Sequence, residues 1–243
     1  MSTELKSEFA NCVSMQHIYK TFNPNSVNEV VLFRDFNLDI PKGQFVSVVG
    51  SNGSGKTTVL NLLCGSIPVD SGTVFVNGKD ITRFKEYQHS KMIGRVFQDP
   101  AKGTCPELTI LENMALADNK GKSFSLSRGV NKKRIDAYRT QLEQLHLGLE
   151  DKLNLQVANL SGGQRQALAL LICTMTPLDL LILDEHTAAL DPHSSETVME
   201  LTENIVRTKQ LTTLMVTHNL KLSLIHIFHA FFTEQSPKRH FLI

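Results

Sequence analysis

The strongest constraint on this chain is a glycine-rich loop that links an apolar run to an apolar helical pattern. Residues 44–49 (QFVSVV) form a short apolar run typical of a buried parallel strand. Residues 50–57 follow directly and read GSNGSGKT, which matches the phosphate-binding loop at every required position. In such a loop, backbone N–H groups and the start of the next helix surround a phosphate chain. We expect Lys56 to reach the β- and γ-phosphates and the Thr57 hydroxyl to ligate Mg²⁺.

A second apolar run ends in two carboxylates. Residues 180–183 (LLIL) precede Asp184 and Glu185. A strand of this kind places Asp184 at the carboxyl edge of a parallel sheet, near the metal of the phosphate loop. Glu185 points elsewhere along the pleat, so we expect it to polarise water rather than bind metal. Together with the phosphate loop, the two carboxylates predict hydrolysis of a nucleoside triphosphate.

A further glycine pair opens a helix at residues 160–164 (LSGGQ). Ser161, Gly162 and Gly163 at a helix start predict a second anion site, which has no lysine and no metal ligand. One chain does not need two γ-phosphate sites, whereas two chains that face head to tail do. We therefore expect these residues and Gln164 to act on a nucleotide held by a partner chain.

Length and composition fit one α/β domain with its own core. The chain has 243 residues, of which 41% are hydrophobic, and it needs no metal or disulfide staple. Cys12, Cys64, Cys105 and Cys173 are scattered singly, so we expect reduced thiols. A net charge of +1 gives no overall electrostatic attraction to nucleic acid, and no nucleic-acid partner is expected. The chain shows neither a signal-peptide pattern nor a run of about 18 apolar residues, which predicts a cytosolic chain without a membrane span.

Strand and helix patterns alternate in the second half of the chain. Strands are expected at residues 178–183 and 211–216, and helices at residues 164–175 and 194–209. This alternation predicts an α/β fold with a mainly parallel sheet flanked by helices.

The first third has a different pattern. Residues 30–33 and 36–40 read as two strands. Residues 73–76 and 79–81 are joined by Asn-Gly, the strongest short-range signal for a hairpin. These segments indicate antiparallel β-structure.

The segment from residue 104 to about residue 160 is expected to form a helical subdomain. Apolar residues recur there at helical spacing behind Asn131, a plausible helix cap. Between Lys120 and Arg139 there are seven Lys or Arg against one Asp. A solvated helix face explains this charge run better than an anion site does.

With these motifs the sequence resembles the ATP-binding cassette (ABC) ATPases, the nucleotide-binding subunits of membrane transporters. The resemblance covers about residues 15–219, and the motifs arrive in the family's order. It implies an α/β P-loop NTPase domain over residues 11–221, with an antiparallel β subdomain and a helical signature subdomain. It also implies ATP and Mg²⁺ as ligands, and a homodimer or paired cassette as the working form.

The resemblance assigns roles to further residues. Phe22 matches the aromatic residue that stacks on adenine, and Gln98 matches the glutamine that senses Mg²⁺ and contacts the transmembrane partner. Asp191 matches the loop that crosses the dimer interface, and His218 matches the histidine that contacts the γ-phosphate. Glu185, Gln98 and His218 are thus the expected catalytic residues, while Thr57, Gln98 and Asp184 are expected to hold magnesium, Asp184 through water or directly. The residues expected around ATP are Phe22, Gly50, Ser51, Asn52, Gly53, Ser54, Gly55, Lys56, Thr57 and Thr58.

One departure from the family pattern favours import. His186 follows the Asp-Glu pair where the family usually has Pro. This variant and residues 23–29 (NPNSVNE) resemble bacterial solute-uptake ATPases encoded beside periplasmic-type binding proteins, some of them for aromatic amino acids. The resemblance implies a permease partner, an indirect extracytoplasmic solute-binding partner, and a peripheral location on the cytoplasmic face of the membrane.

The alternative is a soluble ABC ATPase of DNA repair or translation. Chromosome-type members carry a long coiled coil between the phosphate loop and the signature, whereas about 100 residues separate Lys56 from Ser161 here, without sustained heptads. Translation-type members carry two cassettes in one chain. A P-loop kinase would not need residues 160–164.

The family pattern fails after Lys221. Residues 222–243 (LSLIHIFHAFFTEQSPKRHFLI) contain no Gly, no hairpin signal and no clear amphipathic period. The first six letters also resemble one reading frame of the transposon end used to build sequencing libraries. Our hypothesis is that the natural coding sequence stops near Lys221 and that the tail is a read-assembly artefact. Such a tail is expected to leave the strand ending at Val216 without outer neighbours.

Amplifying this gene from its source DNA tests the hypothesis. We expect the recovered clone to diverge from the present sequence after Lys221. A clone that encodes residues 222–243 unchanged would show that the tail is natural.

Overall fold

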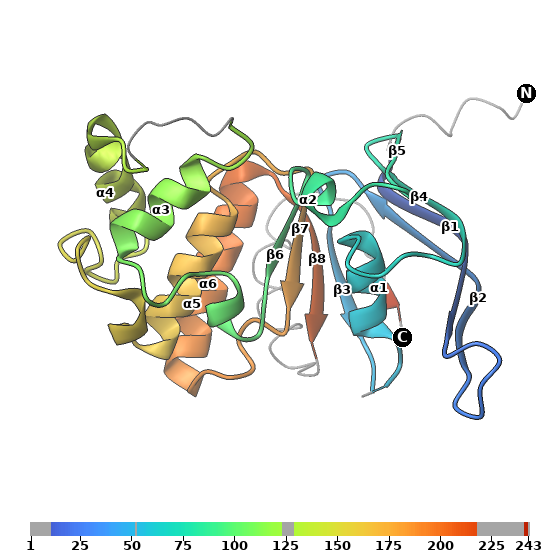
Figure 1. The fold of residues 1–243 in the computed structure, drawn as a ribbon. Coiled ribbons are helices and arrows are strands. Elements are labelled where there is room, and N and C mark those ends of the chain that lie inside the picture. Colours follow the sequence, from blue (N-terminus) through green and yellow to red (C-terminus); the bar gives the residue numbers. More distant parts are fainter. Residues whose placement is uncertain (1–10, 52, 123–128, 218–240, 243) are drawn as a thin grey trace, which may run out of the picture.

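Three parts lie side by side in the molecule (Figure 1). The computed structural model describes residues 11–51, 53–122, 129–217 and 241–242. An antiparallel sheet stands at one end, a parallel sheet in the middle, and a group of helices at the other end. Among the described residues, no helix is both long and apolar enough to cross a membrane.

The parallel sheet has the strand order β6-β7-β8-β3-β9. These strands span Ile93–Val96 (β6), Leu180–Asp184 (β7), Thr212–Thr217 (β8), Phe45–Val49 (β3) and Phe241–Leu242 (β9). Every neighbouring pair runs parallel. The predicted mainly parallel sheet is therefore confirmed.

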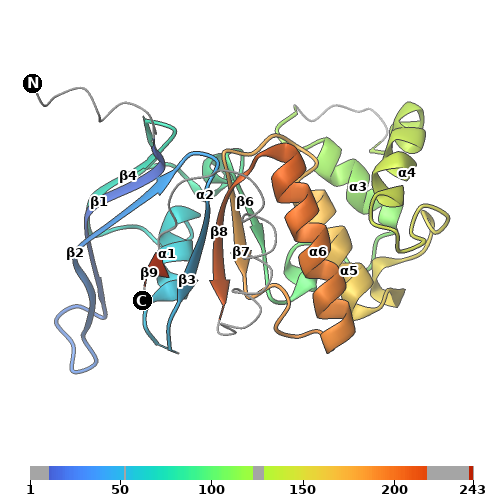
Figure 2. The ribbon, with the colours of Figure 1, turned by 180° about the vertical axis from the view of Figure 1, so that it is seen from behind.

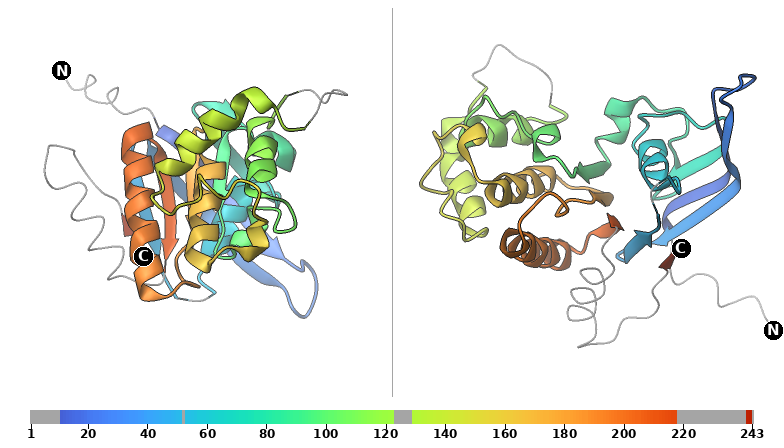
Figure 3. Two further views of the ribbon diagram at one scale, coloured as in Figure 1. Left: turned by 90° about the vertical axis from the view of Figure 1, so that its left-hand side faces the viewer. Right: turned by 90° about the horizontal axis from the view of Figure 1, so that it is seen from below.

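Strand β7 is buried on both faces. Leu181 and Leu183 pack toward helices α5 (Gly162–Cys173) and α6 (Pro192–Lys209), whereas Leu180 and Ile182 face the opposite side. Helix α1 (Lys56–Leu63) covers that opposite side. Figure 3 shows the sheet between the α5–α6 layer and α1, and Figure 2 shows α6 beside α5 from behind. A strand with two covered faces must be apolar throughout, which explains the continuous LLIL run.

The antiparallel sheet has the order β2-β1-β4-β5. Its strands span Asn11–Phe22 (β1), Val30–Pro41 (β2), Ser71–Val76 (β4) and Lys79–Asp80 (β5), and the short helix α2 (Glu86–His89) follows. The predicted hairpin is confirmed, with Asn77 at φ 48° and Gly78 at φ 74° in its turn. The Asn77 side chain also donates a hydrogen bond to Asp179 Oδ1 at 2.6 Å, just before β7.

The two short strands expected within residues 30–40 are one strand with an irregularity. Asp35 has φ 57° and His17 on β1 has φ 51°, and the β1–β2 register shifts near both. His17 Nδ1 lies 2.6 Å from Asp35 Oδ1, and the backbone N–H of His17 donates to Asn37 Oδ1 at 2.9 Å. This bulge bends the ribbon without ending it.

The helical group contains α3 (Ile110–Asp118) and α4 (Ile135–Glu143), together with the start of α5. Helix α4 begins later than the predicted cap: Asn131 instead caps a short 3₁₀ turn, Lys132–Arg134, by accepting from Lys133 N. Further 3₁₀ turns span Pro100–Lys102 and Val157–Asn159.

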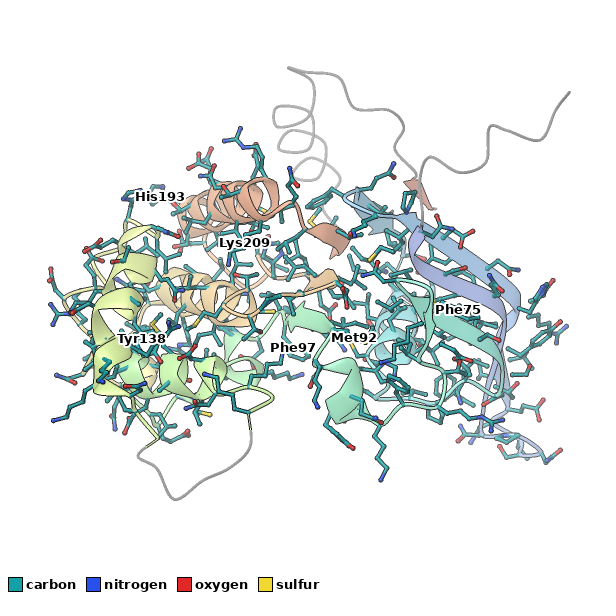
Figure 4. The ribbon with its side chains drawn as sticks, turned by 90° about the horizontal axis from the view of Figure 1, so that it is seen from above. Phe75, Met92, Phe97, Tyr138, His193 and Lys209 are labelled. Carbon is teal, nitrogen blue, oxygen red and sulfur yellow. The ribbon has the colours of Figure 1, made fainter. Side chains whose placement is uncertain are left out.

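Asp118 ties α3 to α4. It accepts two hydrogen bonds from Arg134, at 2.9 and 3.0 Å, and one from the hydroxyl of Tyr138 at 3.0 Å. Lys122 lies 3.7 Å away. Two cations of the basic run are therefore partners of Asp118 rather than wholly solvated. Figure 4 shows Tyr138 inside this helical group.

One expectation about the tail is wrong. Strand β8, which ends at Thr217, is not an edge strand, because it lies between β7 and β3 and pairs with both. Residues 241–242 pair with β3 at Ser47 and Val48. Residues 222–240 and residue 243 of the anomalous tail lie outside the described residues.

Replacing Asp118 by Asn is expected to destabilise the fold at neutral pH by about 1–3 kcal/mol, because it weakens hydrogen bonds to a charged partner. Burial raises the pKa of Asp118, but the hydrogen bonds from Arg134 and Tyr138 outweigh this effect, and the pKa lies below its ordinary value. A depressed carboxyl pKa stabilises the fold above the unfolded-state pKa, and that contribution is lost as pH falls through the folded-state value.

Urea unfolding at several pH values measures this difference. The difference in free energy of unfolding between the wild type and Asp118→Asn should be largest at neutral pH. It should shrink as pH falls below the ordinary carboxyl pKa. Asp136→Asn, at an exposed position of α4, serves as the control. A gap that stays constant with pH would show that the carboxylate charge of Asp118 does not stabilise the fold.

Candidate nucleotide site

The phosphate loop connects β3 to α1. Gly53 and Gly55 have φ values of 83° and 91°, a backbone region that favours glycine. A Cβ on Gly55 would also lie 3.1 Å from the ring of Phe33. Gly55 is the N-cap of α1, and as a glycine it has no side chain to bond to the first turn of the helix. The loop therefore leaves its helix start to accept an anion.

Lys56 is folded back onto this loop. Its side chain is buried, and Nζ donates to the backbone oxygens of Gly50 and Ser51 at 2.7 Å each. The loop carbonyls thus hold the ammonium group inside the curve of the loop. This arrangement keeps a positive charge beside the helix start.

Phe22 borders the same space as the loop. A cavity of about 320 Å³ is lined by Phe22, Leu32, Gly53, Gly55, Lys56, Thr57, Thr58 and Glu185. The end of β1 is held by Asp70, which accepts from Lys20 Nζ at 2.7 Å and from Thr21 N at 2.6 Å. The Lys20 ammonium lies 5.6 Å from the centre of the Phe22 ring. The aromatic side chain is therefore held at the cavity by a charged pair.

A larger cleft, of about 1030 Å³, opens beside the cavity. Its walls include Thr57, Gln98, Asp184 and Glu185. The hydroxyl, amide and carboxylate oxygens gathered here are hard donors of the kind that Mg²⁺ prefers, and magnesium needs few protein ligands when phosphates and water supply the rest. No cluster of three His, Cys, Asp or Glu side chains suited to a metal occurs among the described residues. The oxygen donors of this cleft fit magnesium bound together with a nucleotide.

Asp184 has a partner that sequence reasoning missed. Arg95 on β6 donates to Asp184 Oδ2 at 2.6 Å and to Asn61 Oδ1 on α1 at 2.8 Å. An arginine within the short apolar strand Ile93–Val96 was the available signal.

Glu185 occupies an unusual backbone position. Its φ is 48°, and its N–H donates to Val216 O at 3.0 Å. A non-glycine residue in the left-handed region carries backbone strain, which often accompanies functional sites. The next residue, His186, is buried and bonds to Thr202 Oγ1 at 3.1 Å. Burial lowers the pKa of His186 to about 4, so its ring is neutral at physiological pH.

The signature residues lie apart from these cavities. Ser161 caps α5: its Oγ accepts from Gln164 N, and Gln164 Oε1 accepts from Ser161 N, both at 3.2 Å. Ser161 and Gly162 are exposed, whereas a Cβ on Gly163 would lie 2.9 Å from Ser194 of α6. Neither cavity described above includes residues 161–164 in its lining. This helix start therefore presents exposed residues outside both cavities.

Asp191 caps the neighbouring helix. It is exposed and accepts from Ser194 N at 3.0 Å at the start of α6. The hydrogen bonds from Ser194 lower the pKa of Asp191. Asn52 and His218 lie outside the described residues.

Comparison with known proteins agrees with these motifs. A family model described as "ABC transporter" matches residues 33–188. A tyrosine transport ATP-binding protein of Clostridioides difficile is 45% identical over 87% of this chain and 84% of that protein. A thiamine import ATP-binding protein of Histophilus somni is 36% identical over 76% of this chain and 81% of that protein. A methionine import ATP-binding protein of Vibrio vulnificus is 32% identical over 86% of this chain but only 58% of that protein.

Solved structures agree on the fold. A dimeric ATP-binding cassette in a post-hydrolysis state with ADP and Pi superposes with a TM-score of 0.71 at 27% identity, over 86% of this chain and 89% of that chain. A nucleotide-free cassette from an ABC transporter gives a TM-score of 0.73 at 23% identity, over 89% of this chain and 85% of that chain, and this likeness concerns the fold alone. The predicted fold class is confirmed. The chain therefore belongs to the ABC transporter family, as one of its ATP-hydrolysing cassettes.

Proposed function

We propose that this chain is the subunit that drives import of a small solute, such as an amino acid, through a permease. The observation that carries the ATPase part of the proposal is the split site: the phosphate loop borders one cavity, while exposed Ser161 and Gly162 open a helix outside it. The names of the relatives support import, because they concern tyrosine, thiamine and methionine. None of these names supports the alternative of DNA repair or translation.

The proposed setting follows from this role. The chain would sit peripherally on the cytoplasmic face of the membrane, as one of a homodimer or pair of cassettes bound to the permease. An extracytoplasmic solute-binding protein would take part indirectly. The dimer described for a solved cassette of the same fold supports the paired form.

Each half of the site has a distinct task in this proposal. Phe22 stacks on adenine, while residues 50–58 bind the phosphates through backbone N–H groups, Lys56 and the threonine hydroxyls. Ser161, Gly162, Gly163 and Gln164 complete the site on the partner's nucleotide, and Asp191 lies at the interface. The glycine at the N-cap of α1 and the ion pair between Lys20 and Asp70 support the assignment of the first half of the site.

Hydrolysis needs a water molecule directed at the γ-phosphate. Glu185, which borders both the small cavity and the larger cleft, is the proposed base that polarises this water. Gln98 and His218 are the proposed residues that contact magnesium and the γ-phosphate, respectively. Thr57, Gln98 and Asp184 would hold Mg²⁺, which when bound neutralises phosphate charge and so favours transfer of the γ-phosphoryl group to water.

Replacing Glu185 by Gln tests the assembly. The side chain keeps its shape but loses its basic carboxylate, so ATP is expected to remain bound and to hold two chains together. Size-exclusion chromatography with light scattering at saturating ATP should show a dimer, and hydrolysis should be lost. Lys56→Ala is the matched control and should lose nucleotide binding, because it removes the buried cation of the loop. A Glu185→Gln chain that stays monomeric would refute this role of Glu185.

Uptake in cells tests import directly. Deleting the gene is expected to abolish ATP-driven uptake of one small solute, measured with radiolabelled amino acids including tyrosine. The wild-type gene should restore uptake, whereas the Lys56→Ala gene should not. Unchanged uptake, together with recovery of ribosomes or DNA rather than a permease on purification, would favour the soluble alternative.

A further inference from the structure

Arg95 lies at the centre of a buried polar contact in the larger cleft, where the magnesium site is proposed. One terminal guanidinium nitrogen donates to Asp184 Oδ2 at 2.6 Å, and the second terminal nitrogen donates to Asn61 Oδ1 at 2.8 Å. The side chains of Arg95 and Asp184 are only 12% and 15% exposed. The guanidinium also lies 4.8 Å from the ring centre of Phe97, which Figure 4 shows at the boundary between the helical group and the sheet. Arg95 thus links β6, β7 and α1.

The contact uses only one side of the carboxylate. Oδ1 of Asp184 accepts no hydrogen bond from a described residue, while Oδ2 is taken by Arg95. Arg95, Asp184, Thr57 and Gln98 all line the same cleft. A shielded carboxylate without a cation nearby is costly, and a triphosphate would add further negative charge to this space.

We propose that Arg95 is a positioning residue that balances the charge of Asp184 while no metal is bound, so that nucleotide can enter the site before or without magnesium. The inference rests on the magnesium site proposed above. Arg95 holds Oδ2 and leaves Oδ1 without a hydrogen bond from a described residue. When magnesium is present, the metal supplies positive charge at the same carboxylate, and Arg95 matters less for nucleotide binding.

The test is the binding of a fluorescent ATP analogue with excess EDTA and, separately, with saturating Mg²⁺. Arg95→Met keeps the apolar stem but removes the charge. We expect metal-free affinity to fall by roughly tenfold, a change of about 1.4 kcal/mol, with a clearly smaller loss in Mg²⁺. Arg95→Lys keeps the charge and should retain most of the metal-free affinity. This second variant keeps the proposal testable if Arg95→Met fails to fold. Arg139→Met, at an exposed position of α4, is the matched control.

A second substitution separates charge balance from simple loss of packing. In Arg95→Met the Asp184 carboxylate is left without its cation, so adding Asp184→Asn, which removes that negative charge, should restore metal-free binding to near the wild-type level. Equal weakening with and without Mg²⁺ would overturn the proposal, as would a double variant that binds as weakly as Arg95→Met. The metal-free measurement tests Arg95 whether or not Asp184 holds magnesium. The magnesium site fails separately if wild-type hydrolysis does not require Mg²⁺ or if Asp184→Asn leaves that requirement unchanged.

Discussion

Burial of β7 on both faces determines where the two carboxylates that follow its apolar run can lie. Four successive apolar side chains fill the space between α1 and the α5–α6 layer, so the strand cannot carry a charge until it leaves the core. Asp184, the last residue of β7, and Glu185 are the first residues after these four. The loop after β3 ends at the same edge because the neighbouring strands are parallel. The reactive groups therefore meet at one edge of the sheet.

Two positive charges of the site, those of Lys56 and Arg95, already have polar partners in this structure. Loop carbonyls hold Lys56, and a carboxylate holds Arg95. Both cations are shielded from water, where an unpaired charge would cost much more than an exposed one. Nucleotide binding at such a site exchanges one set of partners for another rather than creating contacts from nothing. Its net free energy is a difference between two paired states.

Much of this architecture is readable from local patterns. The phosphate loop, the apolar β7 run and the Asn77-Gly78 turn each have a sequence signature with a direct physical cause. The β1–β2 ribbon is less readable, because Asp35 and His17 adopt left-handed conformations whose side-chain contacts join different strands. Arg95 and Asp184 are 89 residues apart in the chain, and their contact depends on how β6 and β7 align. No local period encodes that alignment. The roles of Phe22, Gln98, Glu185 and Asp191 were inferred from family resemblance or motif order, and they remain proposals.

The turn between β4 and β5 restricts which residues can replace Asn77. Asn77 satisfies a left-handed backbone and also bonds to Asp179 beside the core strand. Glycine would suit the backbone but would lose the side-chain bond, and aspartate would suit the backbone but would face another carboxylate. Two unrelated demands thus fall on one surface position. Asparagine is the residue that meets both, so an exposed hairpin turn far from the nucleotide cavity should tolerate fewer substitutions than its exposure suggests.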